Sequence, residues 1–358
     1  MFLAIKEMRY AKLRYGLVIG IMFLIAYVVF MLSGLASGLA EEVKKVIIDW
    51  DAQEIVLSED ANKTFAASQL TRNDLAAVEG TKKAPIGLYS GAITKGKEKI
   101  NISVFGTSED AFLLPEITKG KGFNQENEII ISKNLADKGF KVGDVVEIGS
   151  SSEKLTITGI FPETYYAVTP VAYTSLDTWT KLKFSKQQFL SEDAKPINGI
   201  VLQSKNGKIN ADSETKLEKL TTTDFIENLP GYSAQNLTLG AMIYFLFFVV
   251  AAVVGIFMYV ITLQKTAIFG VMKAQGISNK FIAKSIISQS FIVGVLGVAI
   301  AFVLAYGTSF VLPDAMPFAV MGVQWLLYSG ILLLVAIIGG LFSIRTVAKV
   351  DPITAIGG

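Results

Sequence analysis

The side chains that most often carry out chemistry in proteins are absent or scattered in this sequence. Its 358 residues include no histidine and no cysteine, which removes the usual general base, the usual zinc ligands and all histidine-dependent nucleophilic catalysis. Acidic residues are paired at Glu41-Glu42, Asp49-Asp51 and Glu59-Asp60. They lack the spacing of a general acid and base and lie in no EF-hand-type loop, so we expect solvated surface charge, with calcium binding as the alternative. No G-x-x-x-x-G-K-[ST] motif occurs either, so the sequence predicts no P-loop and no catalytic site.

Four long apolar segments must position whatever functional residues the chain has. No charged residue occurs in residues 15–40, 228–264, 285–313 and 315–344. Each run is long enough for a helix to cross a bilayer, which takes about 20 residues, and a helix of a soluble protein would carry charges on its wet face. The first run is also too long for the apolar region of a cleaved signal peptide, about 7–15 residues. We predict an α-helical membrane protein with four transmembrane helices, one followed by three, and an extracytoplasmic α+β domain.

The distribution of lysine and arginine predicts the orientation. Basic residues concentrate in the N-terminal segment, in the loop after the second apolar run and in the tail, whereas the segment from Glu41 to Glu227 has an excess of acidic residues. The positive-inside rule therefore places both termini in the cytoplasm. The predicted organisation is a basic N-terminus and first transmembrane helix (1–40), an extracytoplasmic domain (41–232), and three transmembrane helices with a cytoplasmic segment at 264–284 and a cytoplasmic tail (233–358).

Short runs rich in β-branched residues predict the strands of the outer domain. They lie at 52–57, 86–93, 100–106, 128–132, 145–148 and 154–160. Helical structure is expected at 71–78, at 135–140 and at 212–220, where charged residues and leucine alternate at helical spacing. We expect one or two small α+β lobes.

The segment from Gln264 to Ile277 is basic and amphipathic and stops at Gly276. Its composition is typical of a helix lying in the lipid headgroups, or of one that docks into a groove on a partner. Here the sequence resembles the permease subunits of ABC transporters of the MacB/FtsX type, in which a similar Glu-Ile-Gly-Leu-Leu-Arg-Ala-Leu-Gly pattern contacts the ATPase. The resemblance implies the following ATPase-coupling residues: Ile268, Phe269, Gly270, Met272, Lys273 and Gly276. The chain departs from the pattern at Ala267, where the family usually has an acidic residue nearby.

Two further motifs carry the same resemblance, which covers essentially the whole chain. The outer domain has a strand-Ser-x-x-Leu-Ala motif at 128–136 followed by Val142-Gly143-Asp144, and the tail at 345–356 contains Pro352-Ile353-Thr354-Ala355. The resemblance implies a homodimer of this subunit working with two copies of a separate ABC ATPase, which binds the ATP. Closure of that ATPase would move the helices and the outer domains. Membrane lipid surrounds such a protein, and we expect no nucleic-acid partner and no permanently bound cofactor.

Glycine spacing in the first apolar run offers a dimer interface. Gly16 and Gly20 form one G-x-x-x-G pair, and Gly34 and Gly38 form another. Small residues at this spacing permit close helix approach. The alternative is that glycine is simply common in membrane helices.

Within the family, the sequence looks like the haem-exporter permeases of Gram-positive bacteria. The similar stretches are Lys6-Glu7-Met8-Arg9-Tyr10, residues 33–39 and residues 49–52. That resemblance implies haem-contacting aromatic residues at Trp50, at Tyr165 or Tyr166, and at Tyr232, and a location in the cell membrane of a Gram-positive bacterium.

The available side chains permit haem as a transported substrate. Without histidine and cysteine an iron ligand would be tyrosine, methionine or a carboxylate, and five such residues lie at one predicted membrane level: Met31, Glu41, Glu42, Met242 and Tyr244. The alternative for each is an aromatic belt or ordinary packing. Three functions stay open: export of haem or a similar amphiphile, export of a peptide antibiotic or hydrophobic toxin, and FtsX-type regulation of a cell-wall hydrolase without transport.

Overall fold

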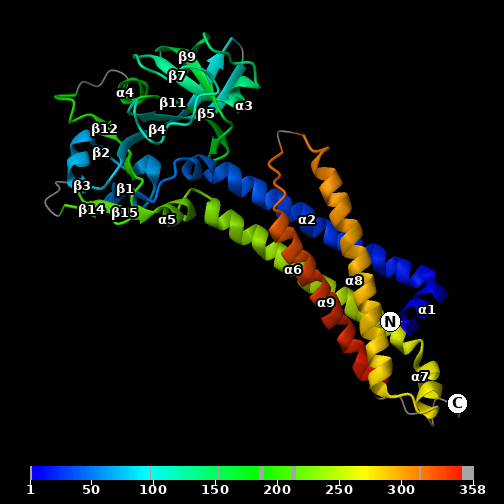
Figure 1. Cartoon of the computed structure of the whole chain (residues 1–358). Helices are drawn as coiled ribbons and strands as arrows, with labels where there is room; N and C mark the ends of the chain where they lie inside the picture. The colour runs from blue at the N-terminus through cyan, green and yellow to red at the C-terminus, as the bar shows by residue number, and fades with distance from the viewer. Residues whose placement is uncertain are drawn as a thin grey trace. The chain divides into compact units, whose positions relative to one another are not determined.

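The computed structural model describes residues 2–96, 98–151, 153–184, 189–210, 215–313 and 316–348. The chain divides into two compact units (Figure 1). We call residues 1–38 with 236–358 the helical unit and residues 39–235 the outer unit.

Long apolar helices build the helical unit. The helices are α1 (Phe2–Tyr10), α2 (Lys12–Asp49), α6 (Tyr232–Leu263), α7 (Thr266–Ala274), α8 (Asn279–Ser309) and α9 (Gly322–Ala348), of which α2 and α6 continue into the outer unit. Within the described residues, α2, α6, α8 and α9 are long and apolar enough to cross a membrane. The predicted order of one helix, an α+β insertion and three helices is confirmed.

Small residues let the helices approach closely. A Cβ atom on Gly339 of α9 would lie 2.6 Å from the carbonyl oxygen of Ala251 on α6, and one on Gly340 would lie 2.0 Å from Oγ of Ser290 on α8. Because lipid offers no hydrophobic drive for association, such close packing holds the helices together. Figure 1 shows α8 and α9 running side by side.

A mixed sheet forms the centre of the outer unit. Among the described residues its strand order is β10-β11-β7-β9-β8-β4-β13-β1-β15, with β5 paired to both β11 and β4, and β6 paired to β9. The strands of the sheet are β1 (Glu54–Ser58), β4 (Lys83–Lys95), β5 (Glu98–Thr107), β6 (Lys119–Gly120), β7 (Glu128–Ser132), β8 (Val145–Ile148), β9 (Lys154–Phe161), β10 (Tyr165–Tyr166), β11 (Thr169–Ser175), β13 (Gly199–Leu202) and β15 (Leu217–Thr221).

Shorter elements surround the sheet. Two small strand pairs join β12 (Pro196–Ile197) to β2 (Leu70–Thr71) and β14 (Lys208–Ile209) to β3 (Val78–Glu79). The helices are α3 (Lys133–Ala136), α4 (Leu176–Phe184) and α5 (Thr222–Glu227), with 3₁₀ turns at Glu59–Ala61, Phe65–Ala67 and Arg72–Ala77.

Trp179 of α4 shows why glycine occurs in the middle of two neighbouring strands. A Cβ atom on Gly87 of β4 or on Gly106 of β5 would lie 2.3 Å from the Trp179 side chain. The two strands pair with Gly87 opposite Gly106, so together they leave room for one buried indole.

Some local predictions were wrong. Residues 217–221 are not helical but form β15 along β1, with Leu220 opposite Ile55, because pairing with a buried strand overrides a weak helical pattern. Residues 212–214 of the predicted helix lie outside the described part. By contrast, the helix expected at 71–78 is present, as a 3₁₀ helix at Arg72–Ala77 with Thr71 as its N-cap. The first long helix continues beyond Ala40 to Asp49, because Val43, Val46 and Ile47 keep one face apolar and buried.

Candidate functional site

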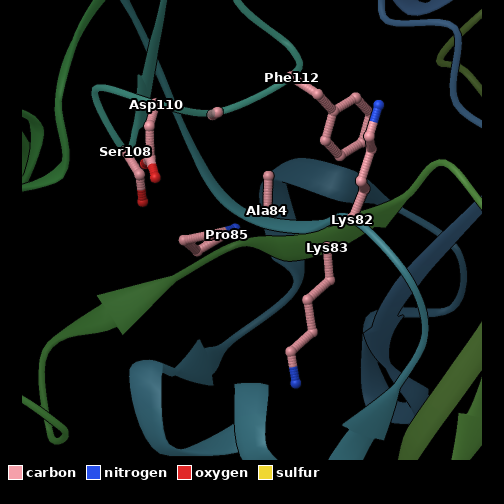
Figure 2. Close-up of a pocket in the computed structure, with 8 residues that line it drawn as sticks. Lys82, Lys83, Ala84, Pro85, Ser108, Asp110 and Phe112 are labelled. Atoms are coloured by element: carbon pink, nitrogen blue, oxygen red, sulfur yellow. The ribbon is translucent and has the colours of Figure 1, made fainter.

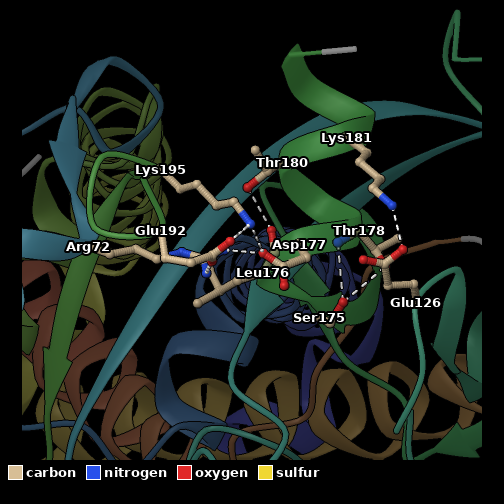
Figure 3. A network of polar contacts seen from close by, with 10 residues as sticks. All are labelled: Arg72, Glu126, Ser175, Leu176, Asp177, Thr178, Thr180, Lys181, Glu192 and Lys195. Atoms are coloured by element: carbon tan, nitrogen blue, oxygen red, sulfur yellow. Dashed lines mark hydrogen bonds and ion pairs between the residues drawn. The ribbon is translucent and has the colours of Figure 1, made fainter. Parts of the chain in front are cut away.

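The polar clusters of the outer unit are structural rather than catalytic. Asp177 of α4 accepts from Arg72 at 2.6 Å and from Lys195 at 2.9 Å, and Glu192 pairs with both bases (Figure 3). Partial burial opposes ionisation of Asp177, but the hydrogen bonds from Lys195 and Arg72 hold its pKa below the usual range. These ion pairs tie α4 to the segments that carry Arg72, Glu192 and Lys195.

A cavity of about 400 Å³ lies at the start of β4, lined by Lys82, Lys83, Ser108, Asp110 and Phe112 among others (Figure 2). Figure 2 shows the Lys83 side chain directed away from Ser108 and Asp110. Its ammonium group donates to the carbonyl oxygens of Leu75 and Val78 at 2.7 and 2.8 Å. Lys83 therefore holds a turn, and the cavity has no arranged acid and base.

The more informative cluster lies beside the C-terminal part of α2. The hydroxyl of half-buried Tyr165 on β10 donates a 2.8 Å hydrogen bond to Glu163. Burial raises the pKa of Tyr165 to about 12, and the carboxylates of Glu163 and Glu42 contribute to the shift. The structure thus places a protonated phenol next to two acidic residues, of which Glu42 was expected from the sequence and Glu163 was not. A carboxylate two residues before a candidate ligand tyrosine was the available signal.

The turn between β10 and β11 connects this cluster to α2. Ala167 and Val168 both have positive φ, 48° and 66°, which is costly for a β-branched residue. The N–H of Ala167 donates to the carbonyl oxygen of Val43 at 3.0 Å, and that of Val168 donates to Glu42 at 3.2 Å. These bonds fix Tyr165 and Tyr166 close to the helix.

Tyr232 lies at the start of α6, partly buried against the core of the outer unit. The ammonium group of Lys44 on α2 lies 5.9 Å from its ring centroid, within the range of a cation–π contact. Glu41 is half-buried on the same stretch of α2. Lys44 is therefore a cation near Tyr232 that the sequence did not single out.

Two of the aromatic candidates are core residues. Trp50 is 1% exposed and Tyr166 is 5% exposed, and both rings contact Phe105 at centroid distances of 5.3 Å. Neither side chain is accessible to a ligand as large as haem. Of the two tyrosines at 165 and 166, the structure leaves only Tyr165 accessible.

The candidates in the membrane-spanning helices lie in the helical unit. Met31 is partly buried against the helix core, whereas Met242 and Tyr244 are 51% and 69% exposed. About three turns into α6, Met242 and Tyr244 therefore present a thioether and a phenol on the surface of this unit. Among the described residues, no group of three acidic side chains could hold a metal ion.

The expected coupling segment forms the helix α7, and Gly276 follows it with φ of 83°. Ile268 is 56% exposed and Val271 44%, while Met272 and Lys273 are half-buried. Phe269 and Gly270 face the helix core of their own chain. The segment thus has an inner face that anchors it and an outer face at Ile268 and Val271.

The two glycine pairs of α2 have different surroundings. A Cβ atom on Gly34 would lie 2.2 Å from the Phe318 ring, and one on Gly38 would lie 2.4 Å from the main chain of Pro317 and Phe318. Among the described residues, no such atom lies within 4 Å of a Cβ atom placed on Gly16 or Gly20. The pair at 34 and 38 therefore seats a loop of the same chain, and only the pair at 16 and 20 is open.

Comparison with known proteins identifies the family. Residues 15–220 match the MacB-like periplasmic core domain, and residues 240–352 match the FtsX-like permease C-terminal domain. The part of the tail motif that follows Ala348, residues 349–356, lies outside the described part of the structure.

Two relatives match this chain over its full length. A protein named “Putative hemin transport system permease protein HrtB” from Staphylococcus haemolyticus (strain JCSC1435) is 29% identical over 100% of this chain and 99% of its own length. A protein of the same name from Staphylococcus epidermidis (strain ATCC 12228 / FDA PCI 1200) is 27% identical over the same shares.

Among solved structures, the extracellular domain of the noncanonic ABC-type transporter YknZ from Gram-positive bacteria matches with a TM-score of 0.32 and 17% identity, over 43% of this chain and 84% of that one.

The two family models, matched at residues 15–220 and 240–352, together cover most of the chain and include both of its units. The chain is a multi-pass membrane protein and the permease component of an ABC transporter, a component that has no ATPase activity and works with a separate ATPase subunit. It belongs to the MacB/FtsX family of ABC transporter permeases.

Proposed function

We propose that this permease couples ATP hydrolysis by its ATPase partner to the efflux of haem, or of a similar planar amphiphile, from the membrane. The main support is the full-length similarity to relatives named for hemin transport. The chemical support is a half-buried tyrosine beside two carboxylates in a chain without histidine and cysteine.

Tyr165 is the side chain we assign to the iron. Tyrosine ligates haem iron in some proteins as the phenolate, and because burial raises the pKa of Tyr165 to about 12, binding of the iron requires a neighbouring group to take the phenolic proton. Glu163 already accepts the phenolic proton in a 2.8 Å hydrogen bond. It is therefore placed to take up that proton when ferric iron approaches the oxygen.

The remaining candidates contribute to binding rather than to ligation of iron. The ring of Tyr232 offers a stacking surface, and Lys44 beside it offers a cation for a haem propionate. Met242 and Tyr244 expose a thioether and a phenol on α6, where an amphiphile could enter from the outer leaflet. We leave Trp50 and Tyr166 out of the site because they are buried.

In this proposal the permease is a homodimer with two ATPase copies, and both termini lie in the cytoplasm of a Gram-positive cell. Ile268, Val271 and Gly276 face the ATPase, and Phe269 and Gly270 anchor α7 to the helices. Residues 41–232 lie outside the cell. The open glycine pair, Gly16 and Gly20, forms the dimer contact.

A haemin titration of the purified permease in lipid nanodiscs, followed through the Soret band, tests the proposal. We expect a saturable shift that Tyr165→Phe and Tyr232→Ala weaken. Tyr89→Phe is the matched control, because Tyr89 is a half-buried tyrosine on β4 of the same unit. A non-saturating signal that is identical in all four proteins would mean partitioning into lipid, and would leave the antibiotic and regulator functions.

A further inference from the structure

Four polar side chains from different elements of the helical unit form a closed ring of contacts at the start of α7. Glu7 of α1 forms a 3.1 Å ion pair with Lys265, the residue before α7. Gln289 of α8 donates to the same Glu7 oxygen and accepts a 2.5 Å hydrogen bond from Tyr15 of α2. The ammonium group of Lys265 lies 5.8 Å from the Tyr15 ring centroid, which closes the ring. We call these four residues the α7 junction.

The α7 junction is shielded from solvent by its own helices. Tyr15 and Gln289 are each 2% exposed, and the side chains of Lys265 and Glu7 are 15% and 16% exposed. Burying polar groups is unfavourable unless each finds a partner, and here the amide of Gln289 also donates to Ser285 at 3.2 Å. Each member of the junction therefore contacts at least two others.

Such a ring contributes more to geometry than to stability. A buried ion pair often adds little net stability compared with apolar packing, but a hydrogen-bonded network accepts only one arrangement of its members. Phe269 and Gly270, the apolar residues that anchor α7, lie in the middle of this helix. The junction holds its N-terminal end, through Lys265 directly before it, against α1, α2 and α8 together.

We propose that Glu7, Tyr15 and Gln289 are positioning residues for ATP coupling. They hold the start of α7 against three other helices, so that a displacement of α7 by the ATPase moves those helices instead of being absorbed by the loop at 264–265. The inference rests on the proposed role of α7 in coupling and assigns the side chains through which the displacement passes.

The test compares permease–ATPase complexes in nanodiscs that carry Glu7→Gln or Gln289→Leu. Ser288→Ala is the matched control, because Ser288 is a buried polar residue of α8 whose hydroxyl donates to the Lys284 carbonyl of its own helix at 2.8 Å. We expect both junction variants to co-purify with the ATPase and to keep basal hydrolysis. Their stimulation by haemin should fall about tenfold or more, as expected for loss of one charge-assisted hydrogen bond.

A charge exchange separates positioning from simple folding. Lys265→Glu alone should uncouple the complex, and the double variant Glu7→Lys with Lys265→Glu should restore much of the stimulation because the ion pair is re-formed. Loss of co-purification in the single variants without recovery in the double variant would reduce the junction to a structural contact and overturn the proposal.

A second readout is independent of the cargo. The chain has no cysteine, so Val311→Cys, placed just after α8 at a position that is 83% exposed, is a unique labelling site. We expect its maleimide labelling rate to change on vanadate trapping in the parent and the Ser288→Ala protein, but not in Glu7→Gln.

If the parent responds to vanadate but not to haemin, the proposed cargo fails while the junction stands. A vanadate response in Glu7→Gln equal to the parent's, or no response in the parent, would refute the junction's role.

Discussion

The indole N–H of Trp50 donates a 2.8 Å hydrogen bond to the phenolic oxygen of Tyr173, and both side chains are almost completely buried. Trp50 directly follows the last residue of α2, and Tyr173 lies in the middle of β11. The bond therefore joins the end of the longest helix to the central sheet of the outer unit. Its place in the core explains an aromatic residue at this position without any ligand.

Replacing Trp50 by Phe tests that explanation. The variant keeps an aromatic ring but leaves the buried Tyr173 oxygen without its donor, which costs about 1–3 kcal/mol. We expect a lower melting temperature and unchanged haemin affinity. Adding Tyr173→Phe should recover part of the stability, because the unpaired hydroxyl is then removed as well. Haemin affinity that fell in Trp50→Phe without a change in melting temperature would return Trp50 to the site.

The contact between Gly38 of α2 and the main chain of Pro317 and Phe318 should be sensitive to the addition of one methyl group at Gly38. Gly38→Ala would place a Cβ atom about 2.4 Å from main-chain atoms that cannot rotate away, and we expect destabilisation of about 1–3 kcal/mol. Gly20→Ala, with open space at that position, should be neutral or stabilising by up to about 1 kcal/mol. Melting followed by tryptophan fluorescence checks both, and equal effects at the two positions would contradict the packing described.

The proposed dimer contact gives the opposite pattern for bulky residues. Gly20→Leu and Gly16→Leu fill open space within one subunit, so they should leave the melting temperature of the isolated subunit unchanged. They should weaken cross-linking between the α2 helices of two subunits, since a close approach needs small side chains. Cysteine cross-linking at Leu13, an exposed residue of α2, measures this; undiminished cross-linking would remove these glycines from the interface.

Substitutions on the outer face of α7 should have different effects from substitutions on its inner face. Ile268→Asp changes an exposed residue and should abolish co-purification of the ATPase without lowering the melting temperature. Phe269→Ala removes a ring that is 3% exposed, which should cost about 3 kcal/mol of stability. If Ile268→Asp retained the ATPase in full, the contact would lie elsewhere.

The Val-Gly-Asp motif gives a pH prediction. Lys95 donates to Asp144 at 2.5 Å, and this hydrogen bond, followed by one from the Lys141 main chain, lowers the Asp144 pKa. A carboxylate with a lowered folded-state pKa stabilises the fold above its unfolded pKa of about 3.9, and this contribution is lost as pH falls through the lower folded pKa.

Asp144→Asn should therefore be less stable than the parent at pH 7, and the difference should shrink as the pH falls below about 4. Melting temperatures measured for both proteins across that range provide the check. Lys95→Met should show the same loss at neutral pH, because it removes the largest cause of the shift. A stability difference that stayed constant down to low pH would argue against the ion pair.

Sequence patterns predicted those elements whose signal is local. The strands at 128–132 and 145–148 were predicted with their observed bounds, since each is a β-branched run between turn-forming residues. The strand at 217–221 was missed because its only determinant is the neighbouring strand β1. Charge-free runs likewise predicted the membrane helices, because lipid imposes its own length and polarity.

The candidate site was less predictable, since it depends on burial and distant contacts. The resemblance implied a haem-contacting role for Trp50, yet Trp50 follows Val43, Val46 and Ile47 along the buried face that continues from α2. That helical spacing was the overlooked signal. The contact between Glu7 and Gln289 joins residues 282 positions apart, and no local pattern predicts it.

The turn at Ala167 and Val168 has a consequence for movement. Its two left-handed residues hold an unfavourable backbone while their N–H groups bond to the carbonyl oxygens of Val43 and Glu42. Axial slip of α2 by one helical turn, about 5.4 Å, would carry both acceptors out of reach. The strained turn would then relax, and Tyr165 would move with it. The turn at Ala167 and Val168 therefore links the position of Tyr165 to that of α2.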